Sequence, residues 1–366
     1  MLPESPLTIK VPGKLMVAGE FAVLEKYQKL VVTAVDRFVY ATLKDTSENR
    51  LTLESFDLDA MPWVYESGAV QVKTDDRRVR FVEEAMNIVY TYLSENNVEL
   101  APFHLFVRSE LDDASGRKYG LGSSAAVVTS VVAAILKRFW PEKPSKKLIF
   151  KLAAISHVKT QGSGSGADVA ASSFGGVLQY ASFQADWLRE AYNASSSVTE
   201  LVNKDWPYFR VNPIQLPDNI HMCIGWTGSP ASTHQLVQGI LQLKTDNRKL
   251  YEQFMADSRT AVSTFLDGMA ANEPSAIIDG TKQNRRALAA VGRDANVDIE
   301  TPLLKTLCDL AEDFGGAGKP SGAGGGDCGI AFMPTREKAE ELMSAWKAAG
   351  IKPLDITVST NGAVKI

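Results

Sequence analysis

The chain has 366 residues, of which 45% are apolar and 22% are charged, and its formal net charge is −4. This composition is that of a globular protein and excludes collagen, coiled coils and disordered chains, and at about 150 residues per domain the length predicts two domains. Nucleic-acid-binding proteins commonly have an excess of basic residues, which this chain lacks, so we expect no nucleic-acid partner. Any anion site must therefore be built by local residues.

The cysteines and the apolar segments indicate a compartment. Cys223, Cys308 and Cys328 are few and far apart, which fits neither a metal site nor a disulfide framework and suits a reducing environment. The N-terminal residues show no signal peptide, and the longest apolar stretch, 125–136, is too short to span a bilayer. We therefore expect a cytoplasmic protein without a membrane partner.

The first half of the chain alternates predicted strands with predicted helices. Leu7–Val11 and Leu15–Ala18 flank the turn signal Pro12-Gly13, which predicts two strands paired around a turn. The β-branched and aromatic residues of Val31–Lys44 predict another strand, and apolar residues at helical spacing predict a helix over Arg80–Asn97. The remaining elements are a strand over Phe103–Val107, helices over Ser123–Phe139 and Lys146–Lys159, and a polar surface segment over Ser182–Lys204.

The second half is richer in long helices. Strands precede and follow these helices, and this order predicts an α+β fold. Two prolines, Pro213 and Pro217, interrupt the pattern and place the boundary between domains 1–215 and 216–366. The predicted helices cover Thr233–Leu243, Leu250–Ala270, Pro274–Ala290, Thr301–Phe314 and Arg336–Ala349, and the predicted strands cover His221–Ile224, Cys328–Phe332 and Leu354–Thr357.

A glycine-rich loop ahead of an apolar helix is the strongest functional signal. Its glycines let the backbone approach a ligand, and the unpaired N–H groups and dipole of the helix start favour an anion. Two serines add hydroxyl ligands, and Lys118, with Arg117, adds positive charge just upstream. A plain helix cap after a glycine turn is the alternative that spacing alone leaves open. The loop comprises Gly120, Leu121, Gly122, Ser123, Ser124, Ala125 and Ala126.

Other phosphate-binding loops do not match the sequence. A Walker loop requires Ser or Thr after Gly-Lys, but Gly318-Lys319 is followed by Pro320. The loop at 120–126 also fits the dinucleotide fingerprint, yet it follows a polar loop instead of a strand.

Two further loops carry candidate residues. Lys14 directly follows the Pro12-Gly13 turn, which would hold it near the start of a strand, although a solvated surface lysine is the simpler interpretation of that residue alone. The segment Ser321–Asp327 contains four glycines ahead of an apolar strand. So many glycines in one turn cost backbone entropy, and close approach to a ligand explains them better than a mere connection does.

Taken together, these three loops resemble those of the GHMP kinase superfamily, in the same order and with similar separations. In finer detail the sequence resembles the phosphomevalonate kinases of Gram-positive bacteria, through KVPGKLMVAGEFAVLE, KYGLGSSAAVV, GWTGSPAS and SGAGGGDCGI. The resemblance implies an N-terminal domain like the second domain of ribosomal protein S5 and a ferredoxin-like C-terminal domain. It also implies ATP-dependent phosphorylation of (R)-5-phosphomevalonate to (R)-5-diphosphomevalonate with Mg²⁺, by a monomer or homodimer.

Residue roles follow from the matching positions. The resemblance implies that the backbone of 120–126 cradles the ATP phosphates and that Ser124 ligates Mg²⁺. It also implies that Lys14 contacts the transferring or acceptor phosphate, that Lys118 neutralises phosphate charge, and that Asp168 is the catalytic aspartate. The residues implied to bind the acceptor substrate are Ser165, Ser229, Ser232, Gly322, Ala323, Gly324, Gly325 and Asp327.

One position departs from the family pattern. Where mevalonate kinases have a glutamate metal ligand, this chain has His157, with no acidic residue nearby. We therefore expect Mg²⁺ to be held mainly by ATP oxygens, Ser124 and water, and His157 to lie in a helix interior and not to act as a ligand.

Two alternatives remain open on the sequence. The acceptor could be mevalonate or a sugar, whose alcohol must lose a proton and so needs a base. A phosphate monoester is already mostly dianionic at pH 7 and needs charge neutralisation instead. The protein could also be a non-catalytic nucleotide-binding regulator on the same fold, against which the presence of both Lys14 and Asp168 argues.

Overall fold

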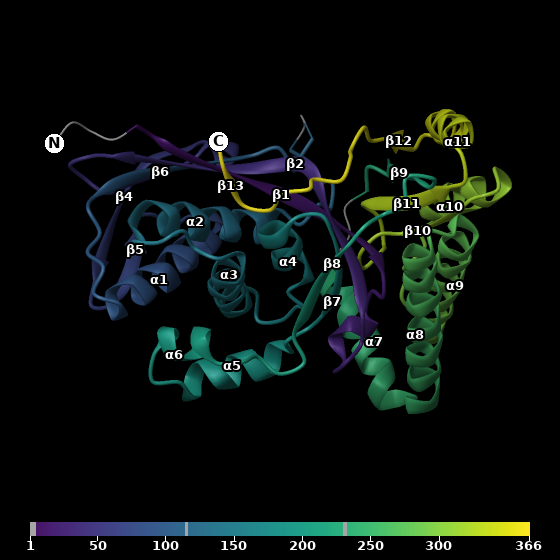
Figure 1. Ribbon diagram of the computed structural model, residues 1–366, viewed down its shortest axis with the longest axis horizontal. Helices are drawn as coiled ribbons and strands as arrows, with labels where there is room; N and C mark the ends of the chain where they lie inside the picture. The colour runs from purple at the N-terminus through teal and green to yellow at the C-terminus, as the bar shows by residue number, and fades with distance from the viewer. Residues whose placement is uncertain (1–4, 114–115, 230–232) are drawn as a thin grey trace.

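The computed structural model describes residues 5–113, 116–229 and 233–366. The protein consists of two halves that lie side by side: a large mixed sheet with helices packed below it, and a small sheet next to long helices (Figure 1). The α+β class expected from the sequence is confirmed. Within the described ranges, no helix is long and apolar enough to cross a membrane.

The large sheet is built around one unexpectedly long strand. β1 (Leu7–Ala18) runs without interruption through Pro12-Gly13 and pairs antiparallel with β2 (Leu30–Asp45) along its length. The predicted pair of strands around a turn is therefore wrong. The ladder shifts register between Pro12 and Gly13, because a bulge accommodates a proline that cannot donate a ladder hydrogen bond.

Helices cover one face of this sheet. The first turn of α2 (Ser123–Phe139) opens towards the second half of the molecule, while most of its remaining side chains are buried among β1, β2 and the neighbouring helices. This explains why its sequence is apolar on nearly every face. The other elements of this half are β3 (Arg50–Leu53), β4 (Leu58–Glu66), β5 (Ala69–Val72), α1 (Arg80–Glu95), β6 (Phe103–Ser109), α3 (Lys146–Gln161), α4 (Ala167–Phe174), β7 (Val177–Ala181), α5 (Ala185–Ala194), α6 (Val198–Asn203) and β8 (Arg210–Ile214).

The polar segment predicted over Ser182–Lys204 contains the helices α5 and α6. Charged side chains from the helices above satisfy both ends of α6. Glu95 accepts hydrogen bonds from the first N–H groups of α6, at 2.9 and 2.7 Å, and the buried Lys151 donates to the carbonyls of Val202 and Lys204, both at 2.6 Å. These contacts hold α6 against the helices α1 and α3.

The second half has an antiparallel sheet in the order β10-β11-β9-β12. The strand predicted over Leu354–Thr357 is wrong. The ladder ends at β12 because the N–H of Ile356 turns back to the carbonyl of Leu354 at 3.0 Å and leaves the sheet. The elements of this half are β9 (His221–Trp226), α7 (Thr233–Asp246), α8 (Arg248–Ala271), α9 (Pro274–Asp294), α10 (Pro302–Asp313), β10 (Ala317–Pro320), β11 (Cys328–Met333), α11 (Arg336–Ala348) and β12 (Lys352–Pro353), whereas the last strand of the chain, β13 (Val364–Lys365), belongs to the large sheet.

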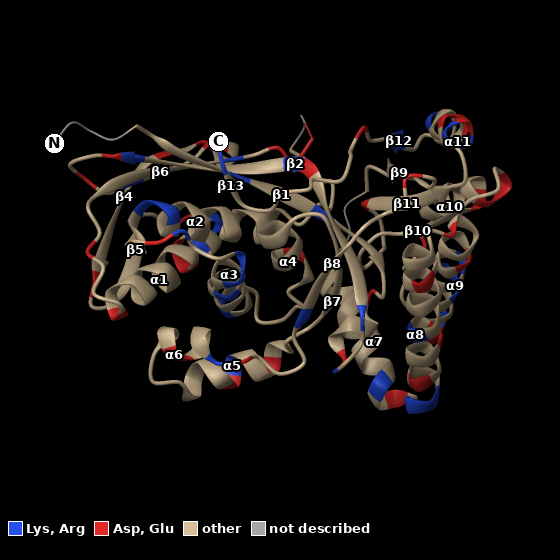
Figure 2. Cartoon of the chain, viewed as in Figure 1, with Lys and Arg blue, Asp and Glu red and all other residues tan. Residues whose placement is uncertain are grey.

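Acidic and basic residues are interspersed along the outer helices of the second half (Figure 2). Pairs of opposite charge one turn apart occur at Arg248–Glu252 on α8, Lys305–Asp309 on α10 and Arg336–Glu340 on α11. Each such exposed pair contributes only a few tenths of a kcal/mol.

The chain passes from the first half to the second and then returns to the first. β8 belongs to the large sheet and β9 to the small one, so the chain crosses between them within 215–220. The last residues then return, because β13 pairs with β1 and Val358 bridges Val35. The C-terminal end therefore completes the first sheet.

Candidate active site

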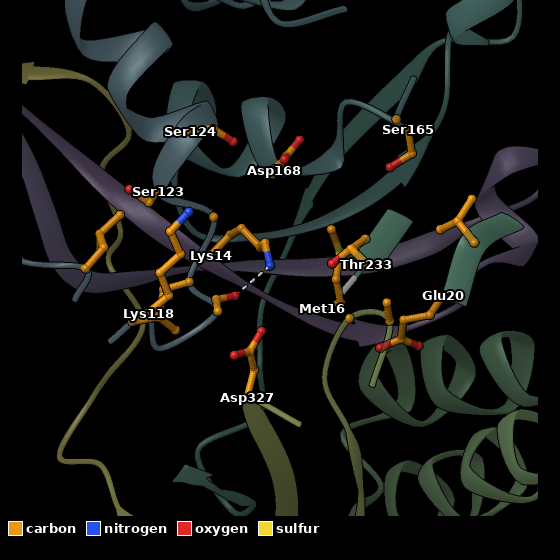
Figure 3. Close-up of a pocket in the computed structure, with 18 of the residues that line it drawn as sticks. Lys14, Met16, Glu20, Lys118, Ser123, Ser124, Ser165, Asp168, Thr233 and Asp327 are labelled. Carbon is orange, nitrogen blue, oxygen red and sulfur yellow. Dashed lines mark hydrogen bonds between the residues drawn. The ribbon is translucent and has the colours of Figure 1, made fainter. Parts of the chain in front are cut away.

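A cavity of about 880 Å³ lies between the two halves. Figure 3 shows that it receives Lys14 from β1, Ser123 and Ser124 from the start of α2, and Asp168 from α4, with Asp327 entering from the opposite side. Segments that are far apart in the sequence therefore meet in one cleft.

The glycine loop at 120–122 presents a helix N-terminus to this cavity. Gly120 and Gly122 have φ of +81° and +76°, a left-handed conformation that glycine adopts without strain. Gly122 is the N-cap residue of α2, and no side chain caps the first turn of that helix. The N–H groups there are available to an anion in the cavity.

Lys14 is fastened to this loop by its backbone and by its side chain. Its N–H donates to the carbonyl of Leu121 at 2.9 Å, and its Nζ donates to the carbonyl of Gly120 at 3.0 Å. Two glycines permit this approach: a Cβ on Gly13 would lie 2.8 Å from the Leu121 oxygen, and a Cβ on Gly122 would lie 2.9 Å from Cγ of Lys14. The Pro12-Gly13 bulge and the glycine loop therefore interlock, and the ammonium group is held over the helix start.

Asp168 sits in the first turn of α4, where the helix dipole favours a carboxylate. Two buried hydroxyls hold this helix in place: Ser172, near its C-terminal end, donates to the carbonyl of Pro12 at 2.9 Å, and Tyr180 donates to the carbonyl of Ser165, just before its start, at 2.6 Å. Burial raises the pKa of Tyr180 well above its usual range, so that it stays a donor. In Figure 3 Asp168 is drawn near Ser124, whereas the Lys14 ammonium group is directed to the carbonyl of Gly120.

The Ser124 hydroxyl has a histidine partner. Ser124 Oγ lies 3.1 Å from Nε2 of His157, whose ring stacks on Phe81 with centroids 5.7 Å apart. His157 is 3% exposed, which confirms its expected place in a helix interior. Burial lowers the pKa of His157, so the ring is neutral at physiological pH.

The cavity offers oxygen donors that suit Mg²⁺, namely the Ser124 hydroxyl and the Asp168 carboxylate. Across the described ranges, no cluster of three or more His, Cys, Asp or Glu side chains could hold a metal ion by itself. Mg²⁺ keeps several waters and commonly binds through one or two carboxylates together with substrate phosphates. The donor set therefore fits a magnesium ion that is shared with a nucleotide.

The glycine turn of the second half splits into two faces. Gly322, Ala323 and Asp327 line the cavity, whereas Gly324 and Gly325 do not. A Cβ on Gly324 would lie 2.3 Å from the Ile299 carbonyl oxygen. The N–H of Gly325 donates to that same oxygen at 2.8 Å, so these two glycines serve the packing of the turn.

Of the remaining predicted residues, some line the cavity and others do not. Ser165 and Ser229 line it, and Lys118 stands exposed at its margin. Ser232 lies outside the described residues. Ala125 and Ala126 do not line the cavity, because they are fully buried below the loop in the core around α2.

Glu20, to which the sequence assigned no site role, also lines the cavity. Its side chain forms a buried ion pair with Lys319, across the two halves, and the two residues are 3% and 0% exposed. The N–H of the preceding Gly19 donates to Asn284 on α9 at 3.0 Å. Lys319, rejected as a nucleotide-binding lysine, therefore joins the two halves, and no local signal in the sequence connects it to Glu20.

Comparison with known proteins gives two family matches. Residues 80–176 match the model of the GHMP kinase N-terminal domain, and residues 277–352 match that of the GHMP kinase C-terminal domain. The phosphomevalonate kinase of Streptomyces sp. (strain CL190) is 32% identical over 96% of each chain.

Two solved structures are also similar. The Lin0012 protein of Listeria innocua has a TM-score of 0.93 and 37% identity, over 99% of each chain. Streptococcus pneumoniae phosphomevalonate kinase in complex with phosphomevalonate and AMPPNP has a TM-score of 0.83 and 26% identity, over 96% of this chain and 99% of that one.

Proposed function

The chain belongs to the GHMP kinase family, and from that premise we propose how its cleft transfers a phosphoryl group. The activity is that of a phosphomevalonate kinase, which uses ATP to convert (R)-5-phosphomevalonate to (R)-5-diphosphomevalonate. The two domain types implied by the sequence resemblance agree with the two family matches. The observation that carries the proposal is the Lys14 side chain, which crosses the helix start at Gly122 and is called the strap below. It lies in a chain that is similar to phosphomevalonate kinases over nearly its whole length.

The triphosphate of ATP would bind at the start of α2. The open N–H groups of the first turn and the dipole of a 17-residue helix attract its negative charge. Lys14 adds a fixed cation above the loop, and Lys118 adds a second one at the margin. Ser123 and Ser124 would supply hydroxyl contacts to phosphate oxygens and to the metal.

The acceptor would bind between Asp168 and the glycine turn of the second half. Gly322, Ala323 and Asp327 form the wall opposite Lys14. Ser165 and Ser229 line the same cavity, and their hydroxyls suit the carboxylate, hydroxyl and phosphate of phosphomevalonate. We include Ser232, three residues after Ser229 in the sequence, in this acceptor site.

In the reaction, an oxygen of the acceptor phosphate attacks the γ-phosphorus of ATP. A new P–O bond forms as the bond to the bridging β,γ-oxygen breaks, and ADP leaves with the electron pair. Because the acceptor is mostly dianionic at pH 7, no proton has to be removed from it. Lys14 therefore acts by neutralising the charge that gathers on the transferring group, and Asp168 acts by orienting Lys14 and the metal waters.

Mg²⁺, when bound, screens the negative charge of the phosphates and orients them. Ser124 would hold it together with the nucleotide and water, and Asp168 would orient the waters around it, which agrees with the oxygen donors of the cavity.

We further propose that domains 1–215 and 216–366 close on the substrates. The phosphate loop belongs to the first and the glycine turn to the second, so closure would exclude water as a competing acceptor. We expect a monomer or a homodimer, as the resemblance implies. The three cysteines are free and buried, in keeping with a cytoplasmic location.

A coupled assay of ADP release tests the function. With ATP and Mg²⁺, phosphomevalonate should be turned over, whereas mevalonate and galactose should not compete as acceptors. Preferred turnover of mevalonate would contradict the assignment, and absence of ATP turnover with all three would favour a nucleotide-binding regulator.

A further inference from the structure

We propose that His157 is a positioning residue that holds the Ser124 hydroxyl in the orientation the reaction uses. The inference deepens the proposed function and rests on the role given there to Ser124. It names a residue that lines no part of the cavity and acts only through its neighbour.

The first observation is the contact itself. Nε2 of His157, on α3, lies 3.1 Å from Oγ of Ser124, on the first turn of α2. His157 belongs to a run of buried residues on α3, where a polar ring is unfavourable unless it has a partner. The serine hydroxyl provides that partner, so the helices α2 and α3 are joined by a polar contact directly behind the cavity wall.

The second observation is that the ring has little freedom to turn. Its face stacks on Phe81 of α1 at a centroid distance of 5.7 Å and an interplanar angle of 30°. Three helices therefore define where Nε2 lies. A ring fixed in this way can select one rotamer of Ser124, a residue that is only partly buried and whose hydroxyl would otherwise rotate among staggered positions.

The consequence concerns the direction of the serine oxygen. One side of Ser124 Oγ is used by His157, and the other side faces the cavity beside Asp168, as Figure 3 shows. A hydroxyl that is already oriented loses less freedom when a metal or phosphate binds. Loss of the histidine should therefore weaken a function of Ser124 without changing any group that touches the substrates.

The chain offers a matched control. His104 also places Nε2 near a hydroxyl, 2.9 Å from Thr52 Oγ1, and also stacks on a phenylalanine, Phe106, at 3.8 Å and 25°. It lies on β6, away from the cavity. Substitutions at His104 remove the same kind of contact and so report the purely structural cost.

The test is a set of variants made with and without Ser124→Ala. His157→Leu removes the contact, His157→Asn keeps a polar group that ends short of Ser124, and His157→Gln can still reach it. We expect His157→Leu and His157→Asn to lower kcat about tenfold and to weaken Mn²⁺ binding to the enzyme–AMPPNP complex, measured by electron paramagnetic resonance, by a similar factor. His157→Gln should recover most of both, and His104→Leu should change neither.

The background with Ser124→Ala decides the mechanism. If His157 acts through Ser124, then His157→Leu should have almost no further effect once the hydroxyl is gone. Equal losses in both backgrounds, or wild-type kinetics and Mn²⁺ binding in His157→Asn, would overturn the inference while leaving the role of Ser124 intact. Wild-type behaviour of Ser124→Ala alone would overturn both. Should His157→Leu fail to fold, the comparison of His157→Asn with His157→Gln carries the same decision.

Discussion

The two walls of the cleft are both rich in glycine, but they are held in position by different means. The wall formed by 120–124 continues into α2, whose body is buried in the main core, and Lys14 straps it from β1. The wall formed by the turn after Ser321 lies between two short strands and depends on backbone hydrogen bonds to neighbouring loops. The first wall is positioned by core packing and the second by a few contacts, so the two can be perturbed separately.

This difference suggests a division of labour. A phosphate site needs N–H groups and a cation in fixed positions, because preorganised charge is what stabilises a phosphoryl-transfer transition state. An acceptor site that closes on its substrate benefits from being attached at fewer points. We expect substitutions in the first wall to reduce turnover and nucleotide binding, and substitutions in the second wall to act mainly on the acceptor.

The largest expected effect is a loss of stability when the Glu20–Lys319 ion pair, which joins the two halves, is broken. Lys319→Met leaves the Glu20 carboxylate buried without its cation, which we expect to lower the free energy of unfolding by about 3–5 kcal/mol. Urea unfolding measures it, with Lys305→Met as the control, because the ion pair of Lys305 is exposed and should contribute less than about 1 kcal/mol. Equal losses for the two lysines would show that the buried pair does not hold the halves together.

Within the first wall, the cation should matter more than the carboxylate. Lys14→Met is expected to lower kcat by about 10²–10³, since it removes a preorganised donor. Asp168→Asn keeps the shape of the side chain and should lose less. Both variants should be assayed at saturating substrates from pH 6 to 9. If Asp168→Asn is the more damaging and also abolishes an ionisation seen in the wild-type profile, then Asp168 is a general base.

The strap over the phosphate loop can be tested through Gly122. In Gly122→Ala the new methyl group would lie 2.9 Å from Lys14 Cγ, so the ammonium group must move. We expect about a hundredfold weaker ATP binding by calorimetry, comparable to the loss of one fixed donor. Gly315→Ala has a similar positive φ of +88° but open space around it, and should bind ATP normally. Equal binding by the two variants would argue against the strap.

The smallest effect should come from the second wall. Gly324→Ala places a methyl group 2.3 Å from the Ile299 oxygen and must displace the turn. We expect the KM for phosphomevalonate to rise about tenfold while the KM for ATP changes little, as when a positioning contact is lost. Gly350→Ala, at φ +80° with nothing nearby, is the matched control. A rise confined to the KM for ATP would reverse the assignment of the two walls.

Local signals in the sequence were sufficient to predict the phosphate loop, the glycine turn and the family of this protein. The start of α2 at Ser123 follows from glycine, serine and an apolar run that are adjacent in the chain. The glycine turn near the C-terminus is local in the same way. Three motifs in a familiar order then indicated the family, and Lys14, Asp168 and Asp327 do line one cavity.

Contacts between distant segments were decided only by the tertiary structure. The bulge that keeps β1 in one piece depends on its pairing with β2, and the end of the ladder at Leu354 depends on β9. The Glu20–Lys319 ion pair and the Ser124–His157 contact join residues whose neighbours in the sequence give no hint of a partner. Glycine, proline and helical periodicity act over a few residues, so they can be read from the chain, whereas the packing of two halves brings together groups whose separation in sequence carries no chemical signal.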